Sequence, residues 1–397
     1  MTRRRAAAID PRTLRRVNTS VTLRALATAT RPLSMTAVAE ATGLSRRTVE
    51  LILDELVASG WVDELDRVPT TGSAGRPARR FELRADHALL AAAQLTTHEA
   101  TVIVTDVRGR VLGRAHDALR SHDDPAAALD TVALLTMRAL DAAGGSLGRL
   151  RAGAVAAGGV IDADGLVRRL INAPHWAGVN LVTELAARVP VTWFADNDAN
   201  LAALGEQWRG AAAGHDDVAW ATLGTRSGIG ILIRGEVYRG FQGAAGEIVE
   251  ASSLPATAFD EHPLGDLSSP VAADRQAARR LVEAARSGEA GALALVDEFA
   301  DHIATILITL SWTIAPSIIV LGGGIEDAED MLLPRVRAVL QRENVPGIAV
   351  EMTRLGGDAP LVGALRCVLD RTDVELFGPI VDIESTAAGG EDLKEEP

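Results

Sequence analysis

A run of acidic and amide side chains, Asp-Asn-Asp-Ala-Asn, occupies residues 196–200. Neighbouring amide and carboxylate groups can hydrogen-bond to adjacent hydroxyl groups of a sugar, and a carboxylate can act as a general base. Asn197 and Asp198 are the side chains that this chemistry would use, with Asp198 as the candidate base. Asn and Asp also cap helices, so the same run can simply begin a helix.

Two glycine-rich turns follow apolar stretches, at Gly224–Gly230 and at Gly322–Gly324. Backbone amides in such turns can approach a phosphate group closely. Each turn is a weak signal alone, because tight turns between strands also need glycine. Between them lies Gly-Ala-Ala-Gly-Glu, which places the carboxylate Glu247 in the same part of the chain.

A second group of polar side chains, Ser45-Arg46-Arg47-Thr48, begins a predicted helix. Ser45 has the side chain that a helix needs at its N-cap. Arg46, Arg47 and Thr48 would then occupy the exposed first turn. In a helix-turn-helix, the first residues of the second helix meet the edges of DNA bases, and these three side chains suit that task.

The surrounding stretch, Ser34–Trp61, would position these residues as two helices joined by a tight turn. Gly43 supplies the turn, since glycine adopts left-handed backbone without steric cost. Buried positions of the second helix follow a helical period: Val49, Ile52, Leu53 and Leu56. Two ordinary core helices would show the same period. The agreement of turn, cap and arginines favours DNA binding.

The residues after Trp61 predict a wing of two short strands, at Val62 and at Phe81–Leu83, joined by a Gly/Pro-rich loop. Arg76 lies in this loop between glycine and proline. An arginine on an extended segment can enter the narrow, negative minor groove of DNA. A solvated hairpin tip is the alternative for the loop alone.

The remaining chain alternates predicted strands and helices, which indicates an α/β body. Three strands are expected between Leu89 and Ala115, and a long helical region between Ala273 and Ile314. A helix is also expected at Leu14–Ala29, after a basic arm at residues 1–12. The acidic residues 380–397 contain few apolar side chains and are expected to be disordered.

Charge is unevenly distributed along the 397 residues. The net charge is −13, yet residues 1–84 hold fifteen arginines against nine acidic residues. A basic head on an acidic body is typical of a domain that meets phosphates joined to one that does not.

The single cysteine, Cys367, excludes a disulfide framework and a cysteine-cluster zinc site. No apolar run follows the basic N-terminus, so we expect a cytoplasmic protein without a membrane span.

Taken together, the motifs resemble the ROK family (repressors, open reading frames and kinases). The resemblance covers residues 10–370 and follows the order of the motifs. It rests on the winged helix-turn-helix and five stretches: Asn197–Asn200, Gly224–Gly230, Gly243–Glu247, Gly322–Gly324 and Leu355–Pro360. It implies an actin-like, ribonuclease-H-like fold of two lobes. Family kinases phosphorylate sugars between the lobes, whereas family regulators sense a sugar or sugar phosphate there.

The first departure from the family pattern concerns the phosphate loop Asp-Ile-Gly-Gly-Thr of the kinases. Counting back from Asp106, that loop falls on residues 94–98, where the aspartate is Gln94 and the two glycines are Thr96 and Thr97. Phosphoryl transfer needs both the metal and the positioning that this loop supplies. We therefore predict no kinase activity and no bound nucleotide cofactor, with Asp198 as a vestige of the catalytic base.

The second departure follows Glu247, where the family usually continues Ile-Gly-His. Here the position of that histidine is Glu250, and the segment from Ala251 to Pro270 lacks the family's zinc-binding cysteines. No structural metal is therefore expected. His262 is the single histidine of this segment, and an isolated histidine is more often a surface residue than a metal ligand. The resemblance carries over Asn197, Asp198, Glu247 and Glu250 as ligand contacts. Asn172 and Trp176 could line the same site, although core packing explains Trp176 equally well.

The sequence thus predicts four regions. These are a basic arm (1–12), a winged helix-turn-helix (13–85), a sugar-kinase-like body (86–375, with lobes at about 86–200 and 201–375) and an acidic tail (380–397). The function expected is a transcriptional repressor that binds double-stranded operator DNA as a homodimer or homotetramer and senses a sugar or sugar phosphate. Two alternatives remain: an ATP-dependent sugar kinase with a fused DNA-binding head, and a regulator whose body only dimerises.

Overall fold

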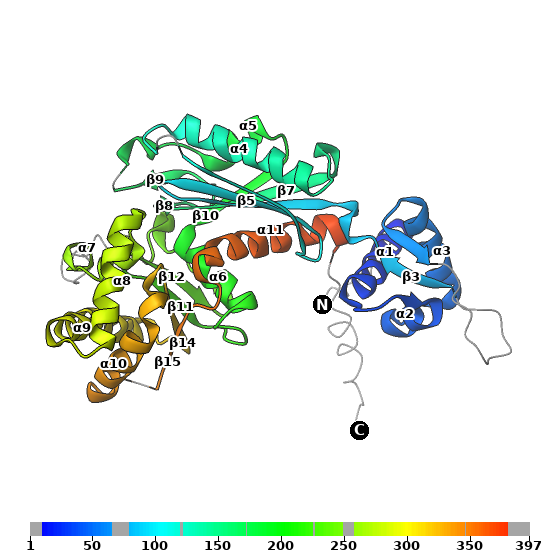
Figure 1. Cartoon of the computed structure of the whole chain (residues 1–397). Coiled ribbons are helices and arrows are strands. Elements are labelled where there is room, and N and C mark those ends of the chain that lie inside the picture. Colours follow the sequence, from blue (N-terminus) through cyan, green and yellow to red (C-terminus); the bar gives the residue numbers. More distant parts are fainter. Residues whose placement is uncertain are drawn as a thin grey trace, which may run out of the picture. The chain divides into compact units, whose positions relative to one another are not determined.

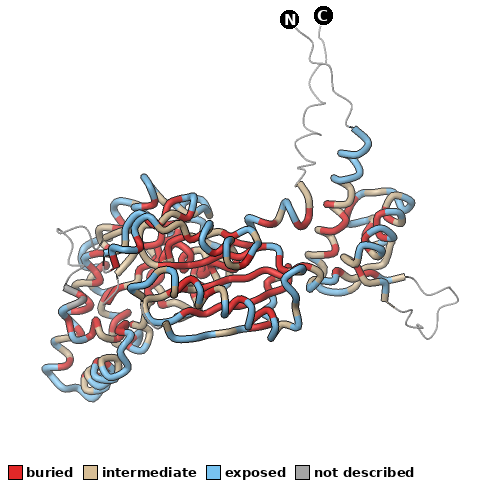
Figure 2. The backbone as a smooth tube through the Cα atoms, turned by 90° about the horizontal axis from the view of Figure 1, so that it is seen from above, coloured by how far each residue is buried: buried red, intermediate tan, exposed pale blue. Residues whose placement is uncertain are grey.

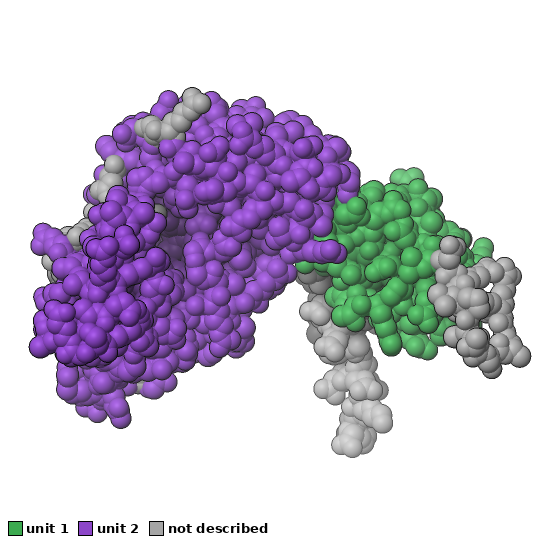
Figure 3. All heavy atoms as spheres, in the orientation of Figure 1, with its two compact units in different colours: residues 1–88, 106–108, 370–397 green, residues 89–105, 109–369 purple. Residues whose placement is uncertain are grey.

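The computed structural model consists of two compact units (Figure 3). Unit 1 takes its residues from the stretches 1–88, 106–108 and 370–397, and unit 2 from 89–105 and 109–369. The structure describes residues 10–65, 79–119, 122–171, 173–224, 227–248, 258–345 and 347–379.

Unit 1 is a winged helix built from three helices and a small sheet of strand order β1-β3-β2 (Figure 1). Its elements are α1 (Pro11–Thr28), β1 (Leu33–Ser34), α2 (Met35–Thr42), α3 (Arg46–Ala58), β2 (Val62–Leu65) and β3 (Arg80–Leu83). The buried side chains of α3 are Val49, Ile52, Leu53 and Leu56, which confirms the predicted helical period.

Helix α1 begins earlier than the sequence pattern indicated. Pro11 is its first residue, and the Asp10 carboxylate accepts a hydrogen bond from the Thr13 amide at 3.4 Å. Proline at the first position of a helix costs nothing, because that amide has no partner within the helix. Pro11 and Arg12, which we expected in the basic arm, therefore belong to this helix.

Residues far from the N-terminus also contribute to unit 1. Arg24 of α1 forms two parallel hydrogen bonds with Asp373, at 2.8 and 2.7 Å, and donates a third to the Gly378 carbonyl at 2.7 Å. Its guanidinium also lies 5.7 Å from the centre of the Phe377 ring. From residues 106–108, Arg108 donates to the Leu26 carbonyl at 3.0 Å. Residues 373–378 thus pack with α1, whereas the predicted body extends to residue 375.

Unit 2 contains two five-stranded sheets of the same design. In each sheet, three strands that follow one another in the sequence lie side by side, and two later strands join them in parallel pairs. The strand orders are β10-β7-β4-β5-β6 and β13-β12-β11-β14-β15. The first sheet consists of β4 (Leu89–Leu95), β5 (Glu99–Asp106), β6 (Val111–Ala118), β7 (Leu150–Ala157) and β10 (Thr192–Asn197). The second consists of β11 (Val218–Thr222), β12 (Gly228–Ile233), β13 (Glu236–Val237), β14 (Ile318–Gly322) and β15 (Ala349–Met352). A separate hairpin pairs β8 (Val160–Ile161) with β9 (Val167–Arg169).

Helices cover these sheets and bury their central strands (Figures 1 and 2). The first sheet packs against α4 (Pro125–Ala142) and α5 (Leu181–Arg188). The core of the second includes α8 (Ala272–Arg286), α9 (Ala290–Thr313) and α10 (Glu329–Arg342). Two further helices, α6 (Asp198–Arg209) and α11 (Ala359–Phe377), cross where glycines permit: a Cβ on Gly363 would lie 1.6 Å from the Leu201 carbonyl oxygen.

The repeated sheet design is that of the actin-like fold, so the predicted two-lobed α/β body is confirmed. Strands β4, β5 and β6 and helices α8 and α9 also confirm the elements expected in those regions. None of the helices within the described residues has the length and apolar character needed to cross a bilayer.

Candidate DNA-binding and ligand sites

Serine side chains cap helices α2 and α3 of the winged unit, and the cap of α3 is Ser45, as the sequence indicated. The Ser34 hydroxyl accepts the Ala37 amide at 3.2 Å, and the Ser45 hydroxyl accepts the Thr48 amide at 3.1 Å. Gly43, between the helices, has a φ of +68°. The caps and the turn fix where α3 begins, and with it the position of the arginines in its first turn.

The two arginines of α3 have different surroundings. Arg46 donates to the Thr36 hydroxyl on α2 at 2.8 Å. Arg47 is 75% exposed and pairs with Glu50 at 2.9 Å. An exposed pair of this kind contributes little to stability and can exchange its partner for a base edge. Arg47 is thus presented outward, whereas Arg46 also holds the two helices together.

The tip of the wing, with Arg76, lies outside the described residues. At its base, Arg79 hydrogen-bonds both carboxylate oxygens of Glu64 at 2.7 Å and one of Asp54 at 3.1 Å. These hydrogen bonds raise the pKa of Arg79. Arg79 therefore neutralises Asp54 on α3, and no local sequence pattern predicts this role.

In the body, the run at residues 196–200 joins the end of β10 to the start of α6. The Asn197 side-chain oxygen accepts the amides of Ala199 and Asn200, at 2.8 and 3.1 Å, and its nitrogen donates to the Gly159 carbonyl at 2.9 Å. Asn197 is thus the helix cap of the simpler interpretation. Asp198 lies in the first turn of α6, where its carboxylate accepts the Ala199 amide at 2.9 Å.

The first residue of this run, Asp196, forms a partly buried ion pair that links the first sheet of unit 2 to the chain just after the last residue of β13. The Asp196 side chain is 2% exposed, and one of its oxygens accepts two hydrogen bonds from Arg239, at 2.9 and 2.6 Å. The other oxygen accepts the Asn197 amide at 2.8 Å and the Asn200 side chain at 3.0 Å. Asp196 belongs to β10, whereas Arg239 follows β13. Sequence reasoning missed Arg239, because no local pattern marks it.

Strand β12 brings the other candidate ligand residue to the same region. A Cβ on Gly230 would lie 1.9 Å from the Ala199 carbonyl oxygen, so the start of α6 packs directly on this strand. The adjacent Ile229 donates its amide to the Gly246 carbonyl at 3.1 Å. Glu247 is half-buried and directly follows Gly246 in the chain. Gly246 is therefore bonded to β12 beside the glycine on which the start of α6 packs. Glu250 lies outside the described residues.

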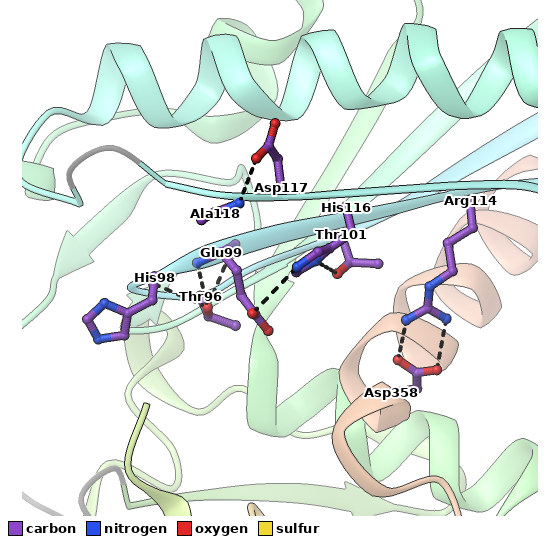
Figure 4. Close-up of polar contacts among 9 residues, drawn as sticks. All are labelled: Thr96, His98, Glu99, Thr101, Arg114, His116, Asp117, Ala118 and Asp358. Atoms are coloured by element: carbon purple, nitrogen blue, oxygen red, sulfur yellow. Dashed lines mark hydrogen bonds and ion pairs between the residues drawn. The ribbon is translucent and has the colours of Figure 1, made fainter. Parts of the chain in front are cut away.

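The turn between β4 and β5 contains the residues that the family resemblance assigns to the kinase phosphate loop, and Figure 4 shows its polar contacts. The Thr96 hydroxyl accepts the amides of His98 and Glu99, at 3.4 and 3.2 Å, and donates to the Glu99 carbonyl at 3.1 Å. The Thr96 amide also donates to this carbonyl at 3.0 Å. The amides of Thr96, His98 and Glu99 are thus engaged within the turn itself.

The later glycine turns have packing reasons for their glycines. A Cβ on Gly224 would lie 2.0 Å from the Ser268 hydroxyl oxygen, and one on Gly322 would lie 2.2 Å from the Trp220 ring. After the second turn, the Glu326 carboxylate lies near the amides of Gly323, Gly324 and its own residue. Burial raises the pKa of this carboxyl, and those amides oppose the shift. Thr225 and Arg226 of the first turn are not among the described residues.

The histidine expected at the surface is instead buried. His262 is 6% exposed, accepts the Leu264 amide at 3.1 Å and packs against the Phe299 ring at 4.9 Å. Burial lowers its pKa, as does the nearby His302. Among the described residues, no group of three His, Cys, Asp or Glu side chains could hold a metal ion.

Trp176, a second candidate for the ligand site, belongs to the core of the first sheet. It is 2% exposed, and its indole nitrogen donates to the His122 carbonyl at 2.7 Å. Core packing therefore accounts for this residue. Asn172 falls outside the described residues.

Comparison with known families gives two matches, one for each part of the chain. The model described as ROK family matches residues 91–249 and 267–371. The model described as IclR helix-turn-helix domain matches residues 22–66, which include α2 and α3.

Relatives include both enzymes and regulators. The glucokinase of Thermotoga maritima is 29% identical over 54% of this chain and 77% of its own length. The xylose repressor of Bacillus spizizenii is 22% identical over 85% of this chain and 91% of its own length. Among solved structures, a ROK family transcriptional regulator described as a homologue of the Escherichia coli MLC protein has a TM-score of 0.69 and 17% identity. It covers 92% of this chain and 99% of its own. The repressor thus matches the winged unit as well as the body.

Proposed function

The chain belongs to the ROK family, and we propose that it is a DNA-binding transcriptional regulator, most simply a repressor, whose body binds a sugar or sugar derivative. The observation that carries this proposal is the capped α3, with Arg47 presented outward, joined to a family body. In helix-turn-helix proteins the corresponding residues read bases in the major groove. The xylose repressor relative covers both parts of the chain.

On DNA, Arg47 would contact a base edge, with Ser45, Arg46 and Thr48 on bases or adjacent phosphates, and Arg76 in the minor groove. Two copies of the head on a pseudo-palindromic operator would require a homodimer or a dimer of dimers. In the body, Asn197, Asp198, Glu247 and Glu250 would contact sugar hydroxyls. A ligand would release DNA only if it binds one arrangement of the protein more tightly than the other.

A sugar kinase is the second candidate, because the glucokinase relative aligns with the body and Asp198 is present. Gln94 in place of the family's aspartate and the engagement of the β4–β5 turn amides by Thr96 speak against it. Phosphoryl transfer requires a carboxylate that organises the metal and backbone amides that position the phosphate. A complete phosphate loop at this turn would supply both. We propose that the body has no kinase activity.

The test begins with full-length protein and a pool of random duplex DNA. Repeated selection should enrich a pseudo-palindromic sequence, and fluorescence anisotropy should then show tight, salt-dependent binding to it. D-glucose and D-xylose are the first ligands to add, chosen from the relatives' names. Loss of DNA binding on adding one of them supports a sugar-responsive repressor, whereas enrichment of no sequence contradicts the proposal.

Two further measurements separate the alternatives. Sugar-dependent release of ADP from Mg-ATP would establish the kinase. If the body serves only for dimerisation, the protein would still bind the selected DNA sequence, but neither sugar would raise its melting temperature. A ligand raises the melting temperature only when it binds the native state.

A further inference from the structure

Helix α3 presents one large apolar side chain on its outer surface. Leu51 is 48% exposed, whereas Val49, Ile52, Leu53 and Leu56 of the same helix are buried. These four side chains occupy the core positions of the helix, and Leu51 is not one of them. Its isobutyl group is available for contact with another molecule.

Leu51 lies on the face of α3 that also carries Arg47. Residues four apart on a helix are neighbours on one side, separated by a rise of about 6 Å along the axis. Base pairs of duplex DNA are about 3.4 Å apart. A helix that places Arg47 on one base pair therefore brings Leu51 to a base pair about two steps away, when its axis follows the groove.

The charge around Leu51 is balanced, as contact with DNA requires. Glu50 pairs with Arg47 at 2.9 Å, and Asp54 pairs with Arg79 at 3.1 Å. A third carboxylate, Glu55, lies four residues after Leu51 and pairs with Arg15. The three carboxylates of α3 are thus each matched by an arginine. Arg47 bonds Glu50 through one nitrogen, so its guanidinium keeps donors for guanine, which has two acceptors in the major groove.

The chemistry of a leucine side chain restricts what it can read. It has neither donor nor acceptor, so it cannot recognise the polar edges of bases. The C5 methyl group of thymine is the apolar feature that the major groove presents. We propose that Leu51 is a specificity-determining residue that packs against a thymine methyl group, about two base pairs from the pair that Arg47 contacts. This inference rests on the proposed DNA-binding function.

The test uses the duplex sequence selected by the full-length protein. Each thymine is replaced in turn by deoxyuridine, which removes only the methyl group. Wild-type protein should lose about fourfold in affinity at one thymine per half-site, the equivalent of one buried methyl group. The Leu51→Ala variant should bind more weakly and change by less than twofold at that same thymine.

Leu14→Ala is the matched control, because Leu14 is also 48% exposed but lies on α1. It should keep the fourfold methyl effect. Both leucines are exposed, so both variants should melt at the wild-type temperature. A methyl effect that persists in Leu51→Ala, or its absence in the wild type, would overturn the inference while leaving DNA binding in place. A change in oligomeric state with an unchanged methyl effect would assign Leu51 to a protein contact instead. Selection that enriches no sequence would instead reject the proposed function itself.

Discussion

The ion pair between Asp196 and Arg239 is the contact whose loss should affect the body most. Arg239→Gln removes the charge and leaves the carboxylate of Asp196, which is 2% exposed, without its cation. Breaking a buried ion pair by removing one partner typically costs 3–5 kcal/mol. We expect about 3 kcal/mol, the lower end of that range, because the Arg239 side chain is 28% exposed and Asp196 keeps hydrogen bonds from Asn197 and Asn200.

Differential scanning calorimetry of the full-length protein measures this cost. For a body of this size, about 3 kcal/mol corresponds to a fall of roughly 5 °C in the melting temperature. The double variant Asp196→Asn/Arg239→Gln removes both charges and should recover most of the loss. A thermodynamic cycle of the two single variants and the double variant then gives the coupling energy.

The pair Arg279 and Asp327 supplies the control, since its side chains are 58% and 48% exposed. Arg279→Gln should cost no more than about 1 kcal/mol, as is usual for surface pairs. If Arg239→Gln cost as little as this control, or if the double variant were no more stable than Arg239→Gln, the pair would not link the first sheet to the chain after β13 energetically. Our account of how the Asn197 region is held would then be wrong.

Three further predictions concern DNA binding, helix packing and pH. Arg47→Ala should weaken binding to the selected DNA by about 1–3 kcal/mol in fluorescence anisotropy at constant salt; affinity equal to that of wild type would refute the assignment of α3 as the recognition helix. Gly363→Ala should destabilise the body by at least about 1–3 kcal/mol in urea unfolding, because its Cβ would meet the Leu201 carbonyl at 1.6 Å, whereas Gly357→Ala, with nothing within 4 Å, should change little. The pKa of His262 is lowered by burial, so the unfolded chain binds its proton first and stability should fall as the pH drops below about 6.5. Melting curves of His262→Asn should show a smaller fall, with a remainder from His122, whose pKa burial also lowers; an unchanged pH dependence would contradict this reasoning.

Features that depend on neighbours along the chain could be predicted from the sequence. Caps such as Ser34 and Ser45 bond to amides three residues away, and the core positions of α3 repeat with the helical period. Both are readable because a helix fixes the distance between residues of given spacing. The order of the glycine motifs similarly indicated the family, which the family comparison confirmed.

Tertiary structure alone decided the contacts between residues distant in sequence. Arg239 meets Asp196 because two sheets bring their strand ends together, and Arg24 meets Asp373 from the opposite end of the chain. Neither arginine lies in a local pattern that distinguishes it from the other thirty-seven arginines of the sequence.

The same holds for His262, which the sequence suggested at the surface and the fold buries against Phe299. Whether a polar side chain caps, pairs or faces solvent depends on what packs over it. The burial of a side chain and its hydrogen-bond partners depend on the folded chain, so they cannot be predicted from the spacing of nearby residues.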